Sequence, residues 1–104
     1  MIRLEKENNM KIESNHNTLS VKGNISSVSD FETIKELLEV IRHKHSDIVL
    51  KIYDSLVINS SLIGYLVKLV NQDGINLNLQ AGNSILFELL DDLGLAETFK
   101  LEKL

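Results

Sequence analysis

The sequence predicts an α/β domain with a mixed, mostly parallel sheet of four to five strands and helices packed mainly on one face. Two patterns carry this prediction. Several short segments alternate apolar and polar residues, as half-buried strands do, and three longer segments repeat apolar residues at helical spacing. The two kinds of segment alternate along most of the chain, which favours parallel strands joined by crossover helices. Right-handed crossovers then place the first two helices on the same face.

A single domain is expected, because 104 residues suit one hydrophobic core. We expect residues 10–104 to form it, with residues 1–9 as an N-terminal arm or a weak edge strand. The chain has no cysteine, no apolar signal-peptide core and no run near the roughly 20 apolar residues that span a bilayer. These features predict a cytoplasmic protein without direct membrane insertion. The net charge of −4 disfavours nucleic acid as a partner.

The first third of the chain predicts a hairpin followed by a helix. Residues 10–14 (MKIES) and 18–22 (TLSVK) alternate with period two and flank Asn15-His16-Asn17, which favours a turn. Ser29-Asp30-Phe31-Glu32 has the form of a capping box and predicts the start of the first helix. The apolar stripe of this helix comprises Phe31, Ile34, Leu37, Leu38 and Ile41.

The remaining chain predicts two further strand and helix pairs and a short last strand. The apolar run of Asp47–Tyr53 predicts a buried strand, and a helix is expected over Ser60–Asp73. Ile75–Leu79 alternates strictly and predicts the next strand, before a third helix over Ser84–Leu93. A last strand is expected around Thr98–Leu101.

This element order predicts a polar edge on the sheet. The loops after three parallel strands, residues 23–28, 54–60 and 80–83, leave the sheet at one edge, where the ligands and partners of open α/β sheets gather. These loops and the helix starts that follow them are rich in small polar residues. The small polar residues are Asn24, Ser26, Ser27, Asn59, Ser60, Ser61, Asn83 and Ser84.

Enzymatic chemistry is not expected from this sequence. A hydrolase would need a histidine near a serine, but His16, His43 and His45 belong to the hairpin turn and the end of the first helix, away from the serine loop. Two residues apart on a helix, His43 and His45 point to different faces, which argues against a metal site. No glycine-rich phosphate loop occurs. We therefore expect no catalytic residue, no metal and no cofactor.

The triplet Asn59-Ser60-Ser61 has two interpretations. Asparagine and serine are favoured helix caps, because their side-chain oxygens accept hydrogen bonds from otherwise unpaired amides. The triplet also suits a modification site. A phosphate on Ser61 would add about −1.5 to −2 charges in the first turn of a helix, where the dipole and the amides favour an anion. Spacing alone leaves both interpretations open.

Residues 50–64 (LKIYDSLVINSSLIG) resemble the STAS domain, in which a strand is followed by Asp-Ser-Ser-Gly-Leu-Gly. Further similarity lies in Leu19-x-Val21-x-Gly23, in Asp-Gly-Ile-Asn-Leu at residues 73–77 and in SILFELLDDLGLAETF at residues 84–99. The resemblance covers about residues 10–101 and implies a STAS-like fold. Asn59 stands where the family has Asp, and Leu62 stands where it has Gly.

The resemblance implies a regulatory function. STAS proteins of the anti-sigma-factor antagonist type are phosphorylated on the second serine of this motif by their partner, an anti-sigma factor that is a serine kinase of the histidine-kinase-like ATPase type. A serine phosphatase reverses the modification. Here the phosphorylated residue would be Ser61. The partner-binding residues would be Asn24, Ser26, Asn59, Ser60, Ser61, Leu62 and Asn83. The alternative is a phosphorylation-independent STAS subunit of a transporter or of a larger signalling complex.

Overall fold

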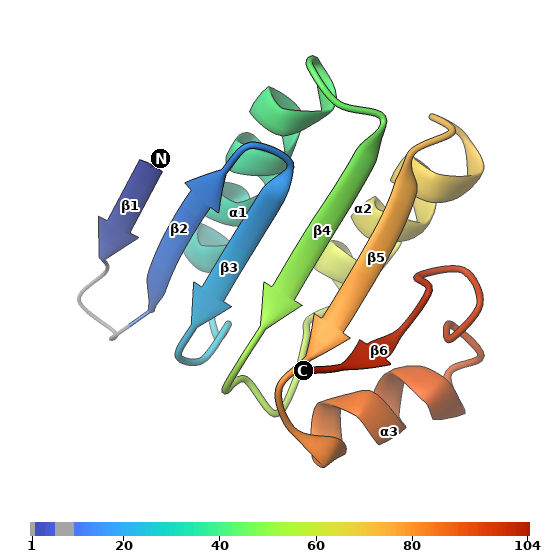
Figure 1. The fold of residues 1–104 in the computed structure, drawn as a ribbon. Helices are drawn as coiled ribbons and strands as arrows, with labels where there is room; N and C mark the ends of the chain where they lie inside the picture. The colour runs from blue at the N-terminus through green and yellow to red at the C-terminus, as the bar shows by residue number, and fades with distance from the viewer. Residues whose placement is uncertain (1, 6–9) are drawn as a thin grey trace.

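The structure, a computed structural model, describes residues 2–5 and 10–104, and Figure 1 shows its α/β architecture. The elements in chain order are β1 (Ile2–Glu5), β2 (Lys11–Asn15), β3 (Thr18–Lys22), α1 (Val28–Arg42), β4 (Asp47–Ile52), α2 (Ser60–Asn71), β5 (Asn76–Ala81), α3 (Ser84–Asp92) and β6 (Glu102–Lys103). The predicted α/β class is confirmed. The part of the expected N-terminal arm at residues 6–9 lies outside the described residues.

The strands form one mixed sheet in chain order. β1, β2 and β3 pair antiparallel, whereas β3, β4, β5 and β6 pair parallel. Among the described residues the sheet has six strands, not four to five, because β1 adds an edge strand beside β2. β6 lies later than the strand expected around residues 98–101. Before β6 the chain makes a helical turn, in which the Phe99 amide donates to the Leu95 carbonyl at 3.0 Å. This turn buries the Phe99 ring.

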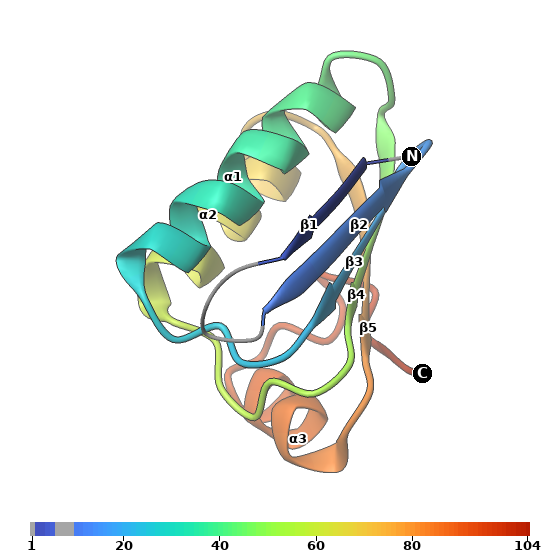
Figure 2. The same ribbon diagram turned by 90° about the vertical axis from the view of Figure 1, so that its left-hand side faces the viewer.

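The two long helices cover one face of the sheet and leave the other face open (Figure 2). Alternate strand residues point toward α1 and α2, so the core lies between these layers. Buried residues from both layers include Ile12, Leu19, Val21, Ile34, Leu38, Leu50, Leu66, Leu69, Leu77 and Leu79. α3 lies near the ends of β4 and β5, below the other two helices in both views. No helix among the described residues is long and apolar enough to cross a membrane.

The first helix begins earlier than its sequence pattern predicts. The capping box is formed by Ser27 and Asp30, and not by Ser29 and Glu32. The Ser27 hydroxyl accepts from the Asp30 amide at 3.1 Å, and the Asp30 carboxylate accepts from the Ser27 amide at 3.2 Å. Asp30 is fully buried, which fixes the start of the helix against the sheet. The later helices α2 and α3 end at Asn71 and Asp92, within two residues of the ends that the sequence predicts.

Candidate partner-binding edge

The three loops that follow β3, β4 and β5 leave the sheet at one edge, at the bottom of Figure 1, and lead into α1, α2 and α3. This arrangement follows from the parallel pairing of these strands, whose carboxyl ends point in the same direction. We call residues 23–27, 53–59 and 82–83, with the first turns of the three helices, the carboxyl edge. The three loops carry the exposed polar side chains of this edge, so the contacts between the loops determine where those side chains lie.

Ser55 connects all three loops from a buried position. Its hydroxyl accepts from the Ile25 amide at 3.1 Å and donates to the Val57 carbonyl at 2.7 Å. Its own carbonyl accepts from the Asn83 side-chain amide at 3.1 Å. The side chain is fully buried, so these bonds are not exchanged freely with water. In the sequence, Ser55 belongs only to the expected loop at residues 54–60, and no local pattern indicates this role.

Close backbone approach further restrains the edge. The Gly82 amide donates to the Ile52 carbonyl at 2.7 Å, and a Cβ atom at position 82 would lie 2.4 Å from the Tyr53 carbonyl oxygen. Residue 82 must therefore be glycine for β4 and β5 to end side by side. The Asp54 carboxylate accepts from the Gly23 amide at 3.0 Å and holds the end of β3 against the loop after β4.

Each helix at the carboxyl edge begins with a neutral cap. The caps are Ser27 for α1, Asn59 for α2 and Asn83 for α3. The Asn59 side-chain oxygen accepts from the Leu62 amide at 2.8 Å, and Asn83 caps α3 at the same distance. The capping interpretation of Asn59 is therefore confirmed. An asparagine at this position keeps the hydrogen bond that an aspartate would make and adds no negative charge.

Ser60 and Ser61 occupy the first two positions of α2 and are exposed. The next residue, Leu62, is fully buried. Its assignment as a partner-binding residue is wrong, because its side chain belongs to the core and not to the surface. For the same reason Leu62 leaves the surface around Ser61 open.

The other predicted partner-binding residues lie together at this edge. Asn24 and Ser26 are exposed, and the Ser26 hydroxyl donates to Asp30 at 3.3 Å. Asn59 and Asn83 are half-buried because their side chains serve as caps. The accessible polar groups of the predicted set are therefore those of residues 24, 26, 60 and 61.

Four large apolar side chains are exposed at the same edge. Their exposed fractions are 76% for Val28, 47% for Leu56, 59% for Val57 and 56% for Ile85. They come from the first turns of α1 and α3 and from the loop before α2, and we call them the apolar rim. Apolar side chains gathered near one edge are typical of a protein-binding surface. In the sequence, Leu56 and Val57 form an apolar patch with Ile58 outside any helix or strand pattern, and the structure exposes the first two and buries Ile58.

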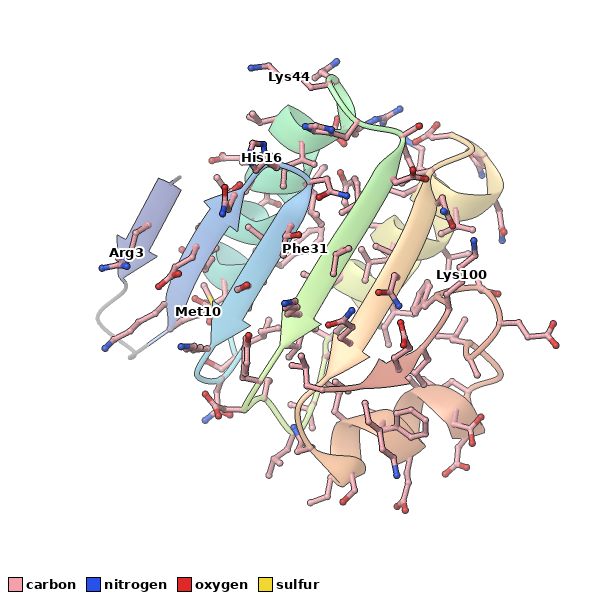
Figure 3. All side chains as sticks on the ribbon, in the orientation of Figure 1. Arg3, Met10, His16, Phe31, Lys44 and Lys100 are labelled. Atoms are coloured by element: carbon pink, nitrogen blue, oxygen red, sulfur yellow. The ribbon has the colours of Figure 1, made fainter. Side chains whose placement is uncertain are left out.

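The histidines do not approach this edge. Figure 3 labels His16 at the hairpin turn and Lys44 after α1, both at the end of the sheet opposite the serine loop. Within residues 2–5 and 10–104 there is no group of three metal-binding side chains that could hold an ion. The polar groups of the carboxyl edge described above are hydroxyls, amides and the carboxylates of Asp30 and Asp54, and they lie beside exposed apolar side chains.

Comparisons with known proteins found no matching family model, no similar curated protein and no similar solved structure. The class of protein is thus defined by the geometry: an α/β domain with a rigid polar edge bordered by exposed apolar side chains.

Proposed function

We propose that this chain is a regulatory protein-binding module of the STAS type, an anti-sigma-factor antagonist switched by phosphorylation of Ser61. The observation that carries the proposal is an exposed serine in the first turn of α2, on a rigid edge that also exposes the apolar rim. The module acts by binding, and the covalent chemistry is supplied by its partners.

A phosphate suits the environment of Ser61. The first amides of a helix have no acceptor within the helix, and its dipole places partial positive charge there. The cap beside the serine is the neutral Asn59, so no cap carboxylate would repel the added group. A phosphate carries about −1.5 to −2 charges and would change a small polar surface into a strongly anionic one.

The switch needs no change of fold. The buried hydrogen bonds of Ser55 and the close approach at Gly82 hold the loops in place, and neither contact involves Ser61. The proposed effect is on the partner. Apolar contacts with the rim would have to form beside a hydrated phosphate, and desolvating that group would weaken the complex.

The proposed partner is an anti-sigma factor with a serine kinase domain of the histidine-kinase-like ATPase type, and the reset enzyme is a serine phosphatase. Both reactions would take place in the cytoplasm. The unphosphorylated antagonist would bind the kinase and release a sigma factor. Apolar side chains at the centre of an interface and polar groups around them are the usual composition of such complexes.

The deciding experiment is phosphorylation by a kinase of this type encoded beside the gene for this chain. Intact mass and fragment spectra should show one phosphate, on residue 61. Ser61→Ala should remove it, whereas Ser60→Ala, a matched exposed position one residue earlier, should keep it. Phosphate on another residue, or none on the wild-type chain, would disprove the switch.

The apolar rim favours one alternative, a phosphorylation-independent STAS subunit of a transporter or a larger signalling complex. Contacts made by Val28, Val57 and Ile85 need no modification. In that case Ser61→Asp should leave the complex intact, and Val57→Ser should weaken it.

A further inference from the structure

The open face of the sheet carries a basic hollow over its antiparallel half. The hollow has a volume of about 230 Å³ and is lined by Arg3, Lys11, Glu13, Ser20 and Lys22. Figure 3 looks onto this face, with Arg3 on the outermost strand. The site is separate from the carboxyl-edge loops, because its residues belong to β1, β2 and β3 and not to the helix starts.

The strand register brings the charged groups of the hollow together. Arg3 lies opposite Glu13 and Glu13 opposite Ser20, while Lys11 lies opposite Lys22 in the neighbouring row. Directly opposed Cβ atoms are about 5 Å apart and diagonal ones about 7–8 Å apart. Long basic side chains at these positions can therefore contact the same small anion.

Two like charges face each other across the strands of the hollow. Lys11 and Lys22 are like charges directly across an antiparallel pair, an arrangement that destabilises a sheet. The Lys22 ammonium group lies 5.2 Å from the centre of the Tyr53 ring. Arg3 is held by Glu13, with 3.3 Å between Nε and the carboxylate oxygen. An anion between the two lysines would remove their repulsion.

The charge of this face is opposite to that of the chain. A second hollow continues the first along β2 and β3 and adds Lys51, so four basic residues line the two together. The acidic residue that lines them is Glu13, and the strand register pairs Glu5 with Lys11. The rest of the chain holds the remaining seven of 11 basic residues but thirteen of 15 acidic residues. A positive face on an otherwise acidic protein favours an anionic ligand.

We infer that this hollow binds a small phosphate-bearing anion, with Lys11 and Lys22 as its main ligands and Arg3 and Ser20 completing the site. Lysine and arginine are the usual phosphate-binding side chains, and a serine hydroxyl adds a neutral donor. The volume suits inorganic phosphate or a small organic phosphate and is below that of drug-sized ligand sites. The acidic Glu13 inside the hollow disfavours a long polyanion, which would pass directly over it.

The test is a titration of the ¹⁵N-labelled full chain followed by NMR. Inorganic phosphate and glycerol 3-phosphate are added separately at constant ionic strength and at a pH above the second pKa of phosphate. The amides of Lys11, Ser20 and Lys22 should shift in a saturable manner. A preference for glycerol 3-phosphate would identify an organic phosphate, and equal binding would show that the phosphate group alone is recognised.

The variants test the two lysines directly. Lys11→Gln combined with Lys22→Gln should weaken binding by about 5-fold or more, the effect expected for two exposed ion pairs. Lys68→Gln, which removes an exposed lysine from α2, should leave binding unchanged. The double variant removes a repulsive pair and is therefore expected to fold.

Three results would overturn the inference. Saturable shifts confined to the amides of residues 60–62 would assign the anion to the start of α2. Equal weakening by Lys68→Gln would indicate nonspecific attraction. Binding of a hexaglutamate peptide without binding of either phosphate would make the face a docking surface for an acidic protein segment. Ser61→Ala should leave these titrations unchanged, because residue 61 does not line the hollow. The anion site is therefore tested separately from the phosphorylation of Ser61.

Discussion

The hydroxyl of Ser55 accepts a hydrogen bond from the amide of Ile25 at 3.1 Å, across 30 residues of chain. Both residues are buried, so neither group is satisfied by water when the bond is removed. Through this bond and the one from Asn83, the loops after β3 and β5 are fixed to the loop that precedes α2.

Ser55→Ala should destabilise the protein by about 1–3 kcal/mol, because it leaves the Ile25 amide buried without its acceptor. Urea unfolding followed by circular dichroism measures the loss. Ser60→Ala, at an exposed position in the same region, should change the free energy of unfolding by less than about 0.5 kcal/mol. Equal effects of the two substitutions would show that Ser55 does not hold the edge.

The cap of α2 predicts a difference between two substitutions at residue 59. Asn59→Ala removes the acceptor of the Leu62 amide and should cost about 1 kcal/mol. Asn59→Asp keeps the acceptor and adds a favourable charge at the helix start, so the free energy of unfolding should stay equal or rise. Thermal or urea unfolding distinguishes them. If Asn59→Asp were as destabilising as Asn59→Ala, the side chain would not act as the cap.

Alanine substitutions at Gly82 and Gly64 should have opposite effects on stability. Gly82→Ala places a Cβ atom against the Tyr53 carbonyl, where only the backbone can move, and should cost about 3 kcal/mol. A Cβ atom at Gly64, inside α2, meets no atom of the described residues within 4 Å. Gly64→Ala should therefore stabilise the protein by about 0.5–1 kcal/mol. Unfolding measurements on both variants test the close approach of β4 and β5.

The contact between Tyr65 and Glu39, which joins α2 to α1, predicts a pH dependence. The hydrogen bond from Tyr65 lowers the pKa of Glu39 below its ordinary value of 4.5, against an opposing effect of burial. Burial first, and then Glu39, raises the pKa of Tyr65 above its ordinary value of 10.0. A lowered carboxylate pKa stabilises the fold above 4.5 and loses this effect as pH falls. A raised phenol pKa stabilises it below 10.0 and loses this effect as pH rises.

Tyr65→Phe should therefore be most destabilising between pH 4.5 and 10.0, with the difference from wild type shrinking at both ends. The expected loss near neutral pH is about 1 kcal/mol, because the Glu39 side chain is 38% exposed and solvent weakens the bond. Urea unfolding across the pH range measures it. In a Glu39→Gln background the acidic limb of the difference should disappear, and its persistence would contradict the assignment.

The sequence predicted the α/β class and the order of the main elements, because periodicity directly reflects which residues face the core. Leu62 carries two conflicting signals in the sequence. It belongs to the apolar stripe of α2 (Leu62, Ile63, Leu66, Val67 and Val70), which predicts burial, whereas its position next to Ser61 suggests a surface role. The structure buries Leu62 and Leu66 of that stripe, and also Leu69, which the stripe did not include.

Other features depended on contacts that no local pattern contains. Residues 27–30 and 29–32 both begin with serine and end with an acidic residue, and the burial of Asp30 decides between them. The last strand starts late because Phe99 first enters the core. The role of Ser55 requires the positions of Ile25 and Asn83, which are 30 and 28 residues away.

The common starting point of the three helices gives the carboxyl edge a polarity of its own. Each helix contributes roughly half a positive charge at its first turn, but the Asp30 carboxylate offsets that of α1. The starts of α2 and α3, which have neutral caps and no acidic residue in the first turn, together place about +1 there. One phosphate carries about −1.5 to −2 charges. A single modified hydroxyl would therefore cancel or reverse the field of the whole edge, and a partner could sense it at several ångströms without touching residue 61.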